Sequence, residues 1–429
     1  MTVYFYTLGC KVNQYESQAM SEMLRKVGFK CVDSAAEAQL VVVNSCTVTA
    51  ESSRKTRQAV RRFKGKNPEA VILLTGCMVQ AFPEMAIGIK EADIVLGNTE
   101  YDKISSIVTE YFERKERIVH IGKHENKEKY CEIKAESFAE HTRAYMKIED
   151  GCNRFCSYCI IPYARGRVRS RALEDIRIEA GKLAENGYKE IVLVGINLSA
   201  YGLDTSVELC DAVEVAAEPE GIKRVRLGSL ECDTISDEAL DRLAECQKFC
   251  PQFHLSLQSG CDKTLREMNR KYDTAFYEDF VKRIRSRFHN PSITTDVMVG
   301  FQGETEEDFE ESRAFVEKIG FARTHIFSYS VREGTKAALR TDRVPNSEKQ
   351  RRSVLMQCAA EKCEREFMQS QVGLISEVLF EEKVNGYWEG YTENYTRVRV
   401  RSDRPIEGEI LAVKITAVGN GVCEGELVL

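Results

Sequence analysis

The sequence lacks the features of an exported or membrane-spanning protein. Its N-terminus has no charged segment followed by a long apolar run, and no apolar stretch is long enough to cross a bilayer. It also contains no low-complexity tract and no internal repeat. We therefore expect a cytoplasmic protein, in a compartment where thiols stay reduced.

Cysteine, by contrast, is abundant, because the 429 residues include 16 of them. A chain of this length buries cores large enough to be stable without disulfides, which a reducing compartment also disfavours. Many cysteines there indicate metal binding or catalysis, although several will be small buried side chains. The formal net charge of −6 does not exclude a nucleic-acid partner, since the basic residues are concentrated in patches.

The pattern of apolar residues predicts an α/β chain with three folded parts. Residues 1–115 alternate short apolar runs with amphipathic helical stretches, which predicts an open parallel sheet. Residues 116–142 are charged and irregular, and we expect a linker region there. Residues 143–369 hold six strand and helix pairs and a trailing helix, which predicts a partial barrel. Residues 370–429 alternate with period two between glycine turns, which predicts a small antiparallel β-barrel.

One short segment, CNRFCSYC, places three cysteines within eight residues: Cys152, Cys156 and Cys159. They follow the first predicted barrel strand, where α/β barrels place active sites. Such close-set thiolates are the usual ligands of iron–sulfur clusters, and three ligands leave one iron with an open coordination position. Zinc is the alternative, but it would need a fourth ligand nearby, and no histidine lies between His141 and His254.

The other predicted barrel strands end in small or polar residues that could line a ligand at the same rim. These candidates are Gly195, Asn197, Ser229, Glu231, Gln258, Ser259, Gly300 and Glu304. Any one of them is ordinary turn chemistry, but several at one rim favour a bound ligand.

A second set of cysteines, Cys10, Cys46 and Cys77, is spread over the N-terminal part. Each directly follows a predicted strand. Because the carboxyl ends of parallel strands share one edge of a sheet, these thiols are expected to converge. The alternative is three buried cysteines in the turns between strands and helices.

With both sets in view, the chain resembles a known family. C-x3-C-x2-C after the first strand of a partial barrel resembles the radical S-adenosylmethionine superfamily. That resemblance implies a 4Fe-4S cluster whose open iron binds S-adenosylmethionine, an adenine contact by Tyr158, and cleavage to a 5′-deoxyadenosyl radical. The segments TLGCKVNQYES, NSCTVT and TGCMVQ resemble the N-terminal domain of methylthiotransferases. There the resemblance implies that Cys10, Cys46 and Cys77 hold an auxiliary 4Fe-4S cluster that carries or receives sulfur.

The resemblance implies a transferase that replaces hydrogen on an unreactive carbon by a methylthio group. A low-potential donor, flavodoxin or ferredoxin, would supply electrons, whereas the sulfur source is unknown. TLGCKVNQ resembles the branch acting on N6-threonylcarbamoyladenosine (t6A) beside the tRNA anticodon. The alternatives are isopentenyladenosine tRNA, an aspartate of a ribosomal protein, and, more remotely, a non-catalytic zinc-stabilised RNA-binding module.

Basic residues agree with an RNA partner. The run YARGRVRSR supplies Arg165, Arg167, Arg169 and Arg171, and residues 52–66 form a basic helix. In the C-terminal barrel the candidates for RNA contact are Arg397, Arg399 and Arg401, with the aromatic residues Trp388, Tyr391 and Tyr395. The alternative is a solvated charged face, since this barrel is acidic as a whole, but it resembles a TRAM domain, which implies RNA binding.

Several residues depart from the family pattern or have no assigned role. The departures are Gly228, Cys232, Cys261 and Gln302, and none is an expected cluster ligand. Cys246, Cys250, Cys358 and Cys363 are interpreted as packing residues in helices, and no partner is indicated for Cys31, Cys131, Cys210 or Cys423.

Overall fold

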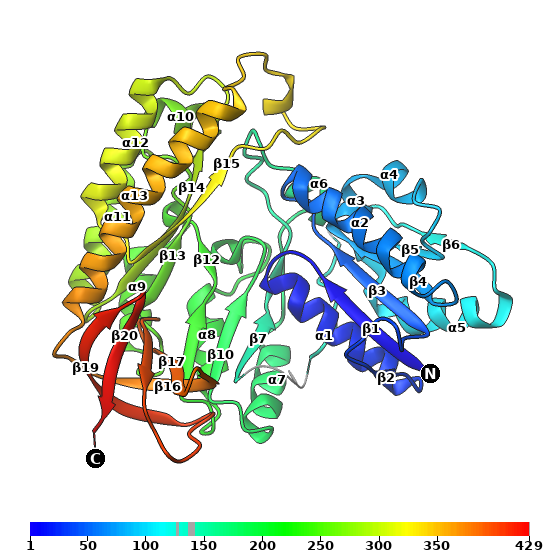
Figure 1. Ribbon diagram of the computed structural model, residues 1–429, viewed down its shortest axis with the longest axis horizontal. Helices are drawn as coiled ribbons and strands as arrows, with labels where there is room; N and C mark the ends of the chain where they lie inside the picture. The colour runs from blue at the N-terminus through cyan, green and yellow to red at the C-terminus, as the bar shows by residue number, and fades with distance from the viewer. Residues whose placement is uncertain (126–127, 136–141, 429) are drawn as a thin grey trace.

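The fold is described by a computed structural model that covers residues 1–125, 128–135 and 142–428. An N-terminal α/β domain lies beside a central barrel-like domain, and a small β-barrel lies below the central domain in the view of Figure 1. The predicted α/β class, with its open sheet, partial barrel and closed small barrel, is confirmed.

Within the described residues, the N-terminal sheet has six parallel strands in the order β2-β1-β3-β4-β5-β6. Its elements are β1 (Thr2–Thr7), α1 (Lys11–Lys26), β2 (Lys30–Cys31), β3 (Leu40–Ser45), α2 (Ala50–Lys66), β4 (Val71–Gly76), α3 (Cys77–Ala81), α4 (Pro83–Ile87), β5 (Ile94–Leu96), the 3-10 helix η1 (Asn98–Lys103), α5 (Ile104–Arg114) and β6 (Ile118–His120). Alternate strand residues serve opposite faces: Val42 joins the core that contains α1, whereas Val41 packs with Val60 of α2. Helices therefore cover both faces, and β3 and β4 are buried throughout.

Strand β6 lies inside the segment expected to be a linker. It pairs in parallel with β5, so the sheet continues past residue 115. Further along, Ile133 and Ala135 are buried in the core shared by the N-terminal and central domains. Positions 126–127 and 136–141 of the expected linker lie outside the described residues.

The central domain is an open barrel of parallel strands, in the orders β11-β10-β7 and β12-β13-β14-β15. Its strands are β7 (Arg143–Lys147), β10 (Glu190–Val194), β11 (Arg224–Leu227), β12 (Ser229–Leu230), β13 (Gln252–Leu255), β14 (Ser292–Val299) and β15 (Arg323–Ser328). Its helices are α6 (Ile161–Arg165), α7 (Leu173–Glu185), α8 (Leu209–Ala217), α9 (Asp237–Glu245), α10 (Asp262–Glu267), α11 (Thr274–Arg287) and α12 (Glu306–Ile319), with 3-10 turns η2 (Leu198–Ala200), η3 (Cys232–Thr234) and η4 (Ala337–Leu339). Gly228 lies between β11, which belongs to the first of these sheets, and β12, which belongs to the second. A short antiparallel pair, β8 (Glu149–Asp150) with β9 (Arg169–Ser170), brackets the loop that carries the close-set cysteines.

Helix α13 (Asn346–Ser370) packs along β15 and α12 and leads into the C-terminal barrel. That barrel closes in the order β16-β17-β18-β20-β19. Its strands are β16 (Ile375–Val384), β17 (Tyr387–Thr392), β18 (Arg397–Val400), β19 (Ile410–Gly419) and β20 (Val422–Leu427). Its pairings are antiparallel apart from β18 with β20, which run parallel. In the part of the chain that the structure describes, no helix has both the length and the apolar composition needed to cross a membrane.

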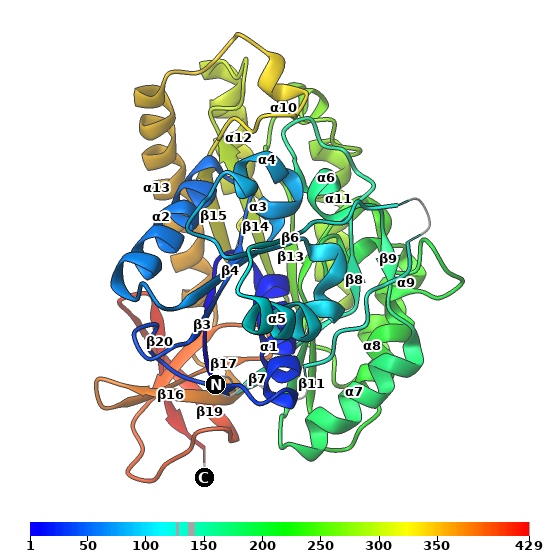
Figure 2. The same cartoon turned by 90° about the vertical axis from the view of Figure 1, so that its right-hand side faces the viewer.

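In Figure 2 the C-terminal barrel lies beside the lower ends of β7 and β11. Two arginines of β11 hold it against the base of the central domain. Arg224 donates to the carbonyl oxygen of Tyr391 at 3.0 Å, and Arg226 donates to that of Glu393 at 2.7 Å. The buried carboxylate of Glu190 accepts from Arg226 at 3.0 Å, which offsets part of the positive charge at this junction. Because buried charges cost free energy unless they are paired and hydrogen-bonded, these contacts fix the placement of the small barrel.

Candidate functional site

The N-terminal trio, which we define as Cys10, Cys46 and Cys77, lies at the carboxyl ends of β1, β3 and β4. Since these strands are neighbours, their loops meet at one edge of the sheet. A Cβ atom at Gly9 would lie 3.1 Å from the Cβ of Cys46, so the first two cysteine loops touch. Gly76, directly before Cys77, has φ +95°, and a Cβ there would lie 2.5 Å from the Ser45 carbonyl oxygen. Only glycine fits at this close approach.

Asn13 braces the loops of the N-terminal trio from the first turn of α1. Its amide donates to the carbonyl oxygens of Leu8 at 2.8 Å and Ser45 at 3.0 Å, which ties the end of β1 to the end of β3. Its Oδ1 atom lies 3.6 Å from Cys10 Sγ. The convergence expected from strand order is therefore present in the geometry.

Arg165, at the end of α6, reaches the N-terminal trio from the central domain. Its Nε atom lies 3.1 Å from Cys77 Sγ, and its guanidinium is paired with the buried carboxylate of Glu16. The Arg165 side chain is 1% exposed. Nothing in the sequence indicates this contact. A basic run beside a cysteine motif does not show that Arg165 pairs with Glu16, which lies 149 residues away.

The barrel trio, which we define as Cys152, Cys156 and Cys159, lies in the loop between β8 and α6. The Cys159 amide donates to the Cys156 carbonyl oxygen at 3.0 Å, so the loop turns tightly there. Phe155 has φ 50°, and its carbonyl oxygen accepts from the Asn269 side chain at 2.9 Å. Hydrogen bonds from the segment after α10 therefore stabilise the left-handed backbone that turns Cys156 inward.

Arg270 contacts the barrel trio much as Arg165 contacts the N-terminal trio, with one guanidinium nitrogen near one cysteine sulfur. Its Nη1 atom lies 3.4 Å from Cys156 Sγ, and its guanidinium is paired with the carboxylate of Glu231. Each trio therefore faces one buried guanidinium that has a glutamate partner, and Arg165 shares its partner Glu16 with Lys147.

Burial raises the pKa of the Cys77, Cys152 and Cys159 thiols to about 12, and it also raises the pKa of the Cys10 thiol. Arg165 opposes this effect at Cys77. A metal centre must therefore displace these protons on binding. Among the described residues, no three or more His, Cys, Asp or Glu side chains stand close enough to hold a single metal ion. In a cubane cluster each thiolate binds a different iron, and two trios of soft thiols facing buried N–H donors fit such clusters.

Residues expected to bind the cofactor differ in how they are placed. Glu231 is tied to the barrel trio through Arg270, whereas Ser229 is exposed at the start of β12. Gln258 has a left-handed backbone with φ 68°, and its backbone N–H donates to the Asp296 carbonyl oxygen at 2.9 Å. Ser259 is fully buried and its hydroxyl accepts from the Cys261 amide at 3.2 Å, so its side chain does not face the open rim.

Gly195 and Asn197 surround a buried carboxyl group that sequence analysis missed. Glu149 Oε2 accepts from the Asn197 amide at 2.7 Å, and a Cβ at Gly195 would lie 2.7 Å from the same oxygen. Burial raises the pKa of Glu149 well above its usual range. The segment KIEDGC, with a carboxylate directly before the cysteine loop, was the available signal.

Tyr158 packs edge to face on Phe301, with ring centroids 6.3 Å apart. Both belong to a small apolar cluster that includes Met268 and Tyr329. The half-buried Tyr158 ring is thus held in place beside the barrel trio.

The RNA contacts expected from YARGRVRSR are corrected for three of its four arginines. Arg165, Arg169 and Arg171 are at most 5% exposed, and carboxylates or carbonyl oxygens accept from them. Such side chains do not reach a phosphate. Arg167 is exposed, lies 4.6 Å from the Phe155 ring centroid, and remains a candidate.

Arg397, Arg399 and Arg401 lie toward the outside of the C-terminal barrel, while Val398 and Val400 fill its interior. The expected alternation along this strand is therefore present. Carboxylates already pair with two of these arginines, Arg397 with Glu389 and Arg399 with Glu424. Arg401 donates to the Tyr387 hydroxyl at 2.8 Å.

The aromatic residues expected to stack on RNA bases are placed differently. Trp388 is 8% exposed and belongs to the core of the C-terminal barrel. Tyr391 and Tyr395 stack on each other at 4.5 Å, and Arg143 of the central domain lies 5.0 Å from both rings. The expectation is corrected, because these rings form the junction between domains.

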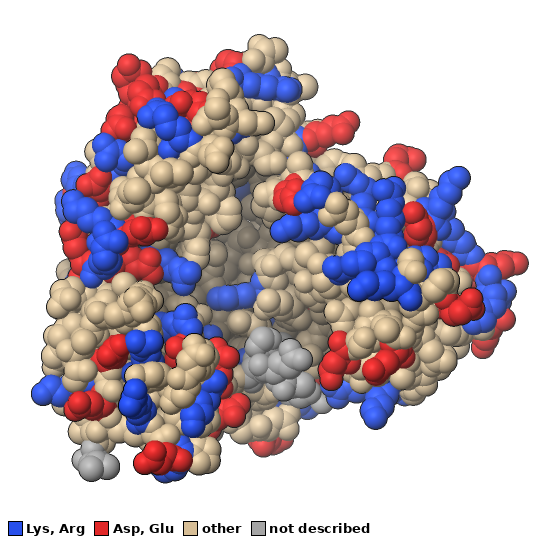
Figure 3. Space-filling model, in the orientation of Figure 1, with Lys and Arg blue, Asp and Glu red and all other residues tan. Residues whose placement is uncertain are grey.

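The expected basic helix is present as α2. Its exposed cations are Arg54, Lys55, Arg61, Arg62 and Lys66. Figure 3 shows Lys and Arg gathered over this helix, beside a hollow between the N-terminal and central domains. The exposed cations of α2 therefore lie at the edge of this hollow.

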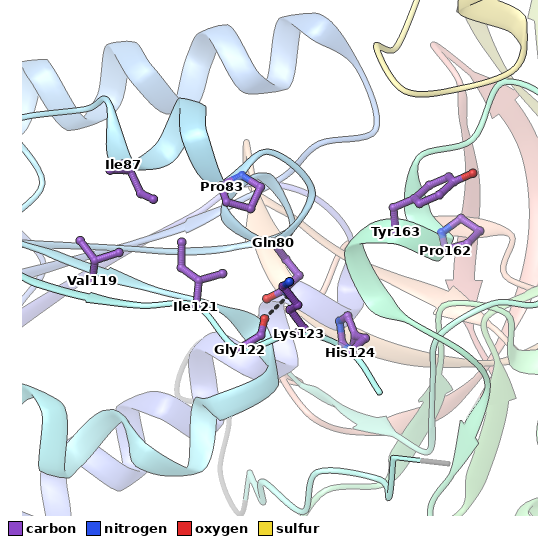
Figure 4. A pocket seen from close by; sticks show the side chains of 10 residues that line it. All are labelled: Gln80, Pro83, Ile87, Val119, Ile121, Gly122, Lys123, His124, Pro162 and Tyr163. Atoms are coloured by element: carbon purple, nitrogen blue, oxygen red, sulfur yellow. Dashed lines mark hydrogen bonds between the residues drawn. The ribbon is translucent and has the colours of Figure 1, made fainter. Parts of the chain in front are cut away.

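The seam between the N-terminal domain and α6 also contains a groove of about 540 Å³. Figure 4 shows that its lining comes from the region of α3 to β6 on one side and from Pro162 and Tyr163 on the other. Gln80 donates to the Gly122 carbonyl oxygen at 2.7 Å across its floor. The groove is lined by no member of either trio, so we assign it no part in the site.

The cysteines interpreted as packing residues are partly confirmed. Cys250 and Cys363 are buried and Cys246 is partly buried, but Cys246 and Cys250 follow the end of α9 and do not lie in a helix. Cys358 lies on α13 as expected but is exposed. The prediction is wrong for Cys358, because its side of the helix faces away from the core.

Two regions of the chain match known families. Residues 146–316 match the Radical SAM superfamily, and residues 2–97 match the Uncharacterized protein family UPF0004. Among solved structures, the radical S-adenosylmethionine methyltransferase TsrM from Kitasatospora setae has a TM-score of 0.58 at 15% identity, covering 79% of this chain and 77% of that one. This likeness shows a shared fold.

Relatives of known name match nearly the whole chain. The threonylcarbamoyladenosine tRNA methylthiotransferase MtaB of Bacillus subtilis is 36% identical, over 100% of this chain and 96% of that protein. The same-named protein of Aquifex aeolicus is 37% identical, over 93% of this chain and all of that protein. A tRNA-2-methylthio-N(6)-dimethylallyladenosine synthase of Clostridium botulinum is 34% identical, over 98% and 95%. With this full-length similarity and both cysteine trios in place, the chain belongs to the radical S-adenosylmethionine methylthiotransferase family.

Proposed function

We propose that the protein is a tRNA methylthiotransferase that inserts a methylthio group at C2 of t6A beside the anticodon. The observation that carries this proposal is the pair of separate cysteine trios, each facing a buried guanidinium. One trio lies at the carboxyl ends of three parallel strands, and the other lies in one loop after the first barrel strand. A chemistry that needs both a sulfur-bearing cluster and a radical-generating cluster requires two such sites. Relatives named for t6A match the full length of the chain, which supports the substrate.

The proposal assigns Cys10, Cys46 and Cys77 to an auxiliary 4Fe-4S cluster and Cys152, Cys156 and Cys159 to the cluster that binds S-adenosylmethionine. When bound, these groups supply the one-electron chemistry that removes hydrogen from an aryl carbon, which side-chain bases cannot do. Tyr158, Gly195, Asn197 and Glu231 would form the cofactor rim.

The protein residues position and shield these groups. Arg165 and Arg270 direct N–H donors at one cysteine of each trio, and Asn13 braces the N-terminal loops. The C-terminal barrel and α2 offer exposed cations to an RNA backbone. The proposal includes a low-potential electron donor, flavodoxin or ferredoxin, and a cytoplasmic location.

A second candidate substrate is isopentenyladenosine in tRNA, because relatives named for that nucleoside are 34% identical over nearly the whole chain. Mass spectrometry of tRNA nucleosides from a deletion strain separates the two. Loss of methylthio-t6A alone supports the proposal, and loss of the methylthio form of isopentenyladenosine supports the second candidate. Unchanged nucleosides would favour a ribosomal-protein substrate.

Iron content tests the two-site arrangement independently of substrate. Anaerobically reconstituted protein should hold about eight irons per chain. Cys156→Ala should hold about four, because the variant lacks one of the three cysteine ligands of the barrel cluster and should lose that cluster. Cys358→Ala, at an exposed cysteine outside both trios, is the matched control and should retain about eight. Colourless protein with zinc alone would point to a non-catalytic RNA-binding module.

A further inference from the structure

Arg165 connects two domains at the point where they carry the two cysteine trios. It is the last residue of α6, the helix that directly follows the barrel trio, yet its guanidinium contacts the N-terminal trio. The Nε atom faces Cys77 Sγ at 3.1 Å, and Nη2 donates to Asn13 Oδ1 at 3.0 Å. The same Oδ1 also accepts from the Cys10 thiol at 3.6 Å, so the guanidinium contacts one sulfur directly and is joined to the Cys10 loop through Asn13.

The charge of this guanidinium is neutralised on its other side. Arg165 Nη2 donates to Glu16 Oε2 at 2.9 Å, and Glu16 is fully buried. Lys147 donates to Glu16 at 2.8 Å and to Asp150 at 2.6 Å. Arg169, whose guanidinium lies 3.5 Å from both Asp150 and Glu128, completes a group of three cations and three carboxylates. A balanced, hydrogen-bonded group of this kind is stable in a protein interior and leaves Nε directed at sulfur.

We propose that Arg165 is a positioning residue that orients the N-terminal trio and raises the reduction potential of the cluster held there. The inference rests on the proposed function, because it requires a cluster at these cysteines. Reduction makes a cluster more negative, and N–H donors to the ligating sulfurs favour the more negative state. Because the donor comes from α6, this effect exists only when the N-terminal domain is docked on the barrel.

A purely structural role is the competing explanation, since removing any buried ion pair can loosen a domain junction. Arg171 and Glu179 offer a matched comparison. They form a buried pair at 2.7 Å between the segment that follows β9 and helix α7 of the same domain. The two side chains are 0% and 1% exposed, and within the described residues none of their hydrogen-bond partners is a cysteine.

The experiment measures the reduction potential of the auxiliary cluster alone. Full-length protein carrying Cys152→Ala, Cys156→Ala and Cys159→Ala is reconstituted anaerobically, and its single remaining cluster is titrated with a redox buffer while the electron paramagnetic resonance signal is followed. Into this background are placed the pair Glu16→Gln with Arg165→Met, or the control pair Glu179→Gln with Arg171→Met. Each pair removes one positive and one negative charge, so neither leaves a buried charge without its partner.

We expect the Arg165 pair to lower the ratio of reduced to oxidised cluster about tenfold at a fixed potential, which corresponds to about 59 mV for a one-electron couple. The control pair should leave the ratio unchanged. Loss of iron from the Arg165 pair at an unaltered melting temperature, with iron retained in the control, would support the orienting role. An unchanged potential with full iron content would overturn the inference. If the background protein itself binds no four-iron cluster, the proposed function fails instead.

Discussion

Arg270 Nη1 lies 3.4 Å from Cys156 Sγ. Its guanidinium is simultaneously the partner of Glu231, so a single side chain joins the barrel trio to the end of β12. Arg270→Met should therefore lower the free energy of unfolding by up to about 3–5 kcal/mol, because it leaves the largely buried Glu231 carboxylate without this partner. Chemical denaturation of the metal-free protein measures this change.

Arg270→Met should also impair the release of 5′-deoxyadenosine, because it removes the N–H donor to Cys156. Adding Glu231→Gln should restore most of the lost stability but not this release, since the donor to Cys156 is still missing. Restored release in the double variant would show that Arg270 matters only as a partner for Glu231.

Glu149→Gln should stabilise the protein at neutral pH. Burial, followed by the repulsion of the Asp150 carboxylate, raises the pKa of Glu149 above its value in the unfolded chain, about 4.3. A group with a raised pKa contributes its full stability below the unfolded pKa and loses it as pH rises toward the folded pKa. The advantage of the variant should therefore grow as pH rises from about 4.3 toward the folded pKa, by at most about 1.4 kcal/mol per pH unit. Denaturation from pH 4 to 7 measures it, and a constant difference would contradict a raised pKa for Glu149.

Tyr395→Ala should loosen the C-terminal barrel from the central domain. Arg143 and Arg226 lie 5.0 and 4.8 Å from its ring centroid, and each contact contributes about 0.5–2 kcal/mol. Hydrogen exchange of β16 and β17 amides should accelerate. Tyr387→Ala is the control, because that ring contacts only arginines of the barrel itself among the described cation–ring contacts. Equal exchange in both variants would show that the junction does not depend on the stacked tyrosines.

Arg401→Ala should weaken tRNA binding without affecting folding. This exposed side chain has no carboxylate partner among the described ion pairs, so its charge is available to a phosphate. The slope of log binding constant against log salt concentration should fall by about one. Arg404→Ala provides the comparison, because Glu409 already pairs with that guanidinium. Equal salt slopes for the two variants would place the RNA elsewhere.

Periodicity and strand order were sufficient to predict the sheet, the partial barrel and the meeting of Cys10, Cys46 and Cys77. These features follow from local pattern and from the geometry of parallel strands. The burial of Arg165 and Arg171 was not predictable in the same way. Their partners, Glu16 and Glu179, are set by packing between α1, α7 and the cysteine loop, and a run of arginines gives no sign of it.

Trp388 and Tyr391 illustrate the same limit in the C-terminal barrel. Their spacing on β17 correctly predicts a strand, but period two alone does not tell which face meets another domain. The junction depends on Arg143 and Arg226, which lie far earlier in the chain.

Arg224 and Arg226 grip main-chain carbonyl oxygens of the C-terminal barrel. These two contacts do not depend on side-chain identity in the small barrel, whereas the contacts of Arg143 and Arg226 with the rings of Tyr391 and Tyr395 do. Residues on the barrel surface away from this junction can therefore change while the barrel keeps its place on the central domain.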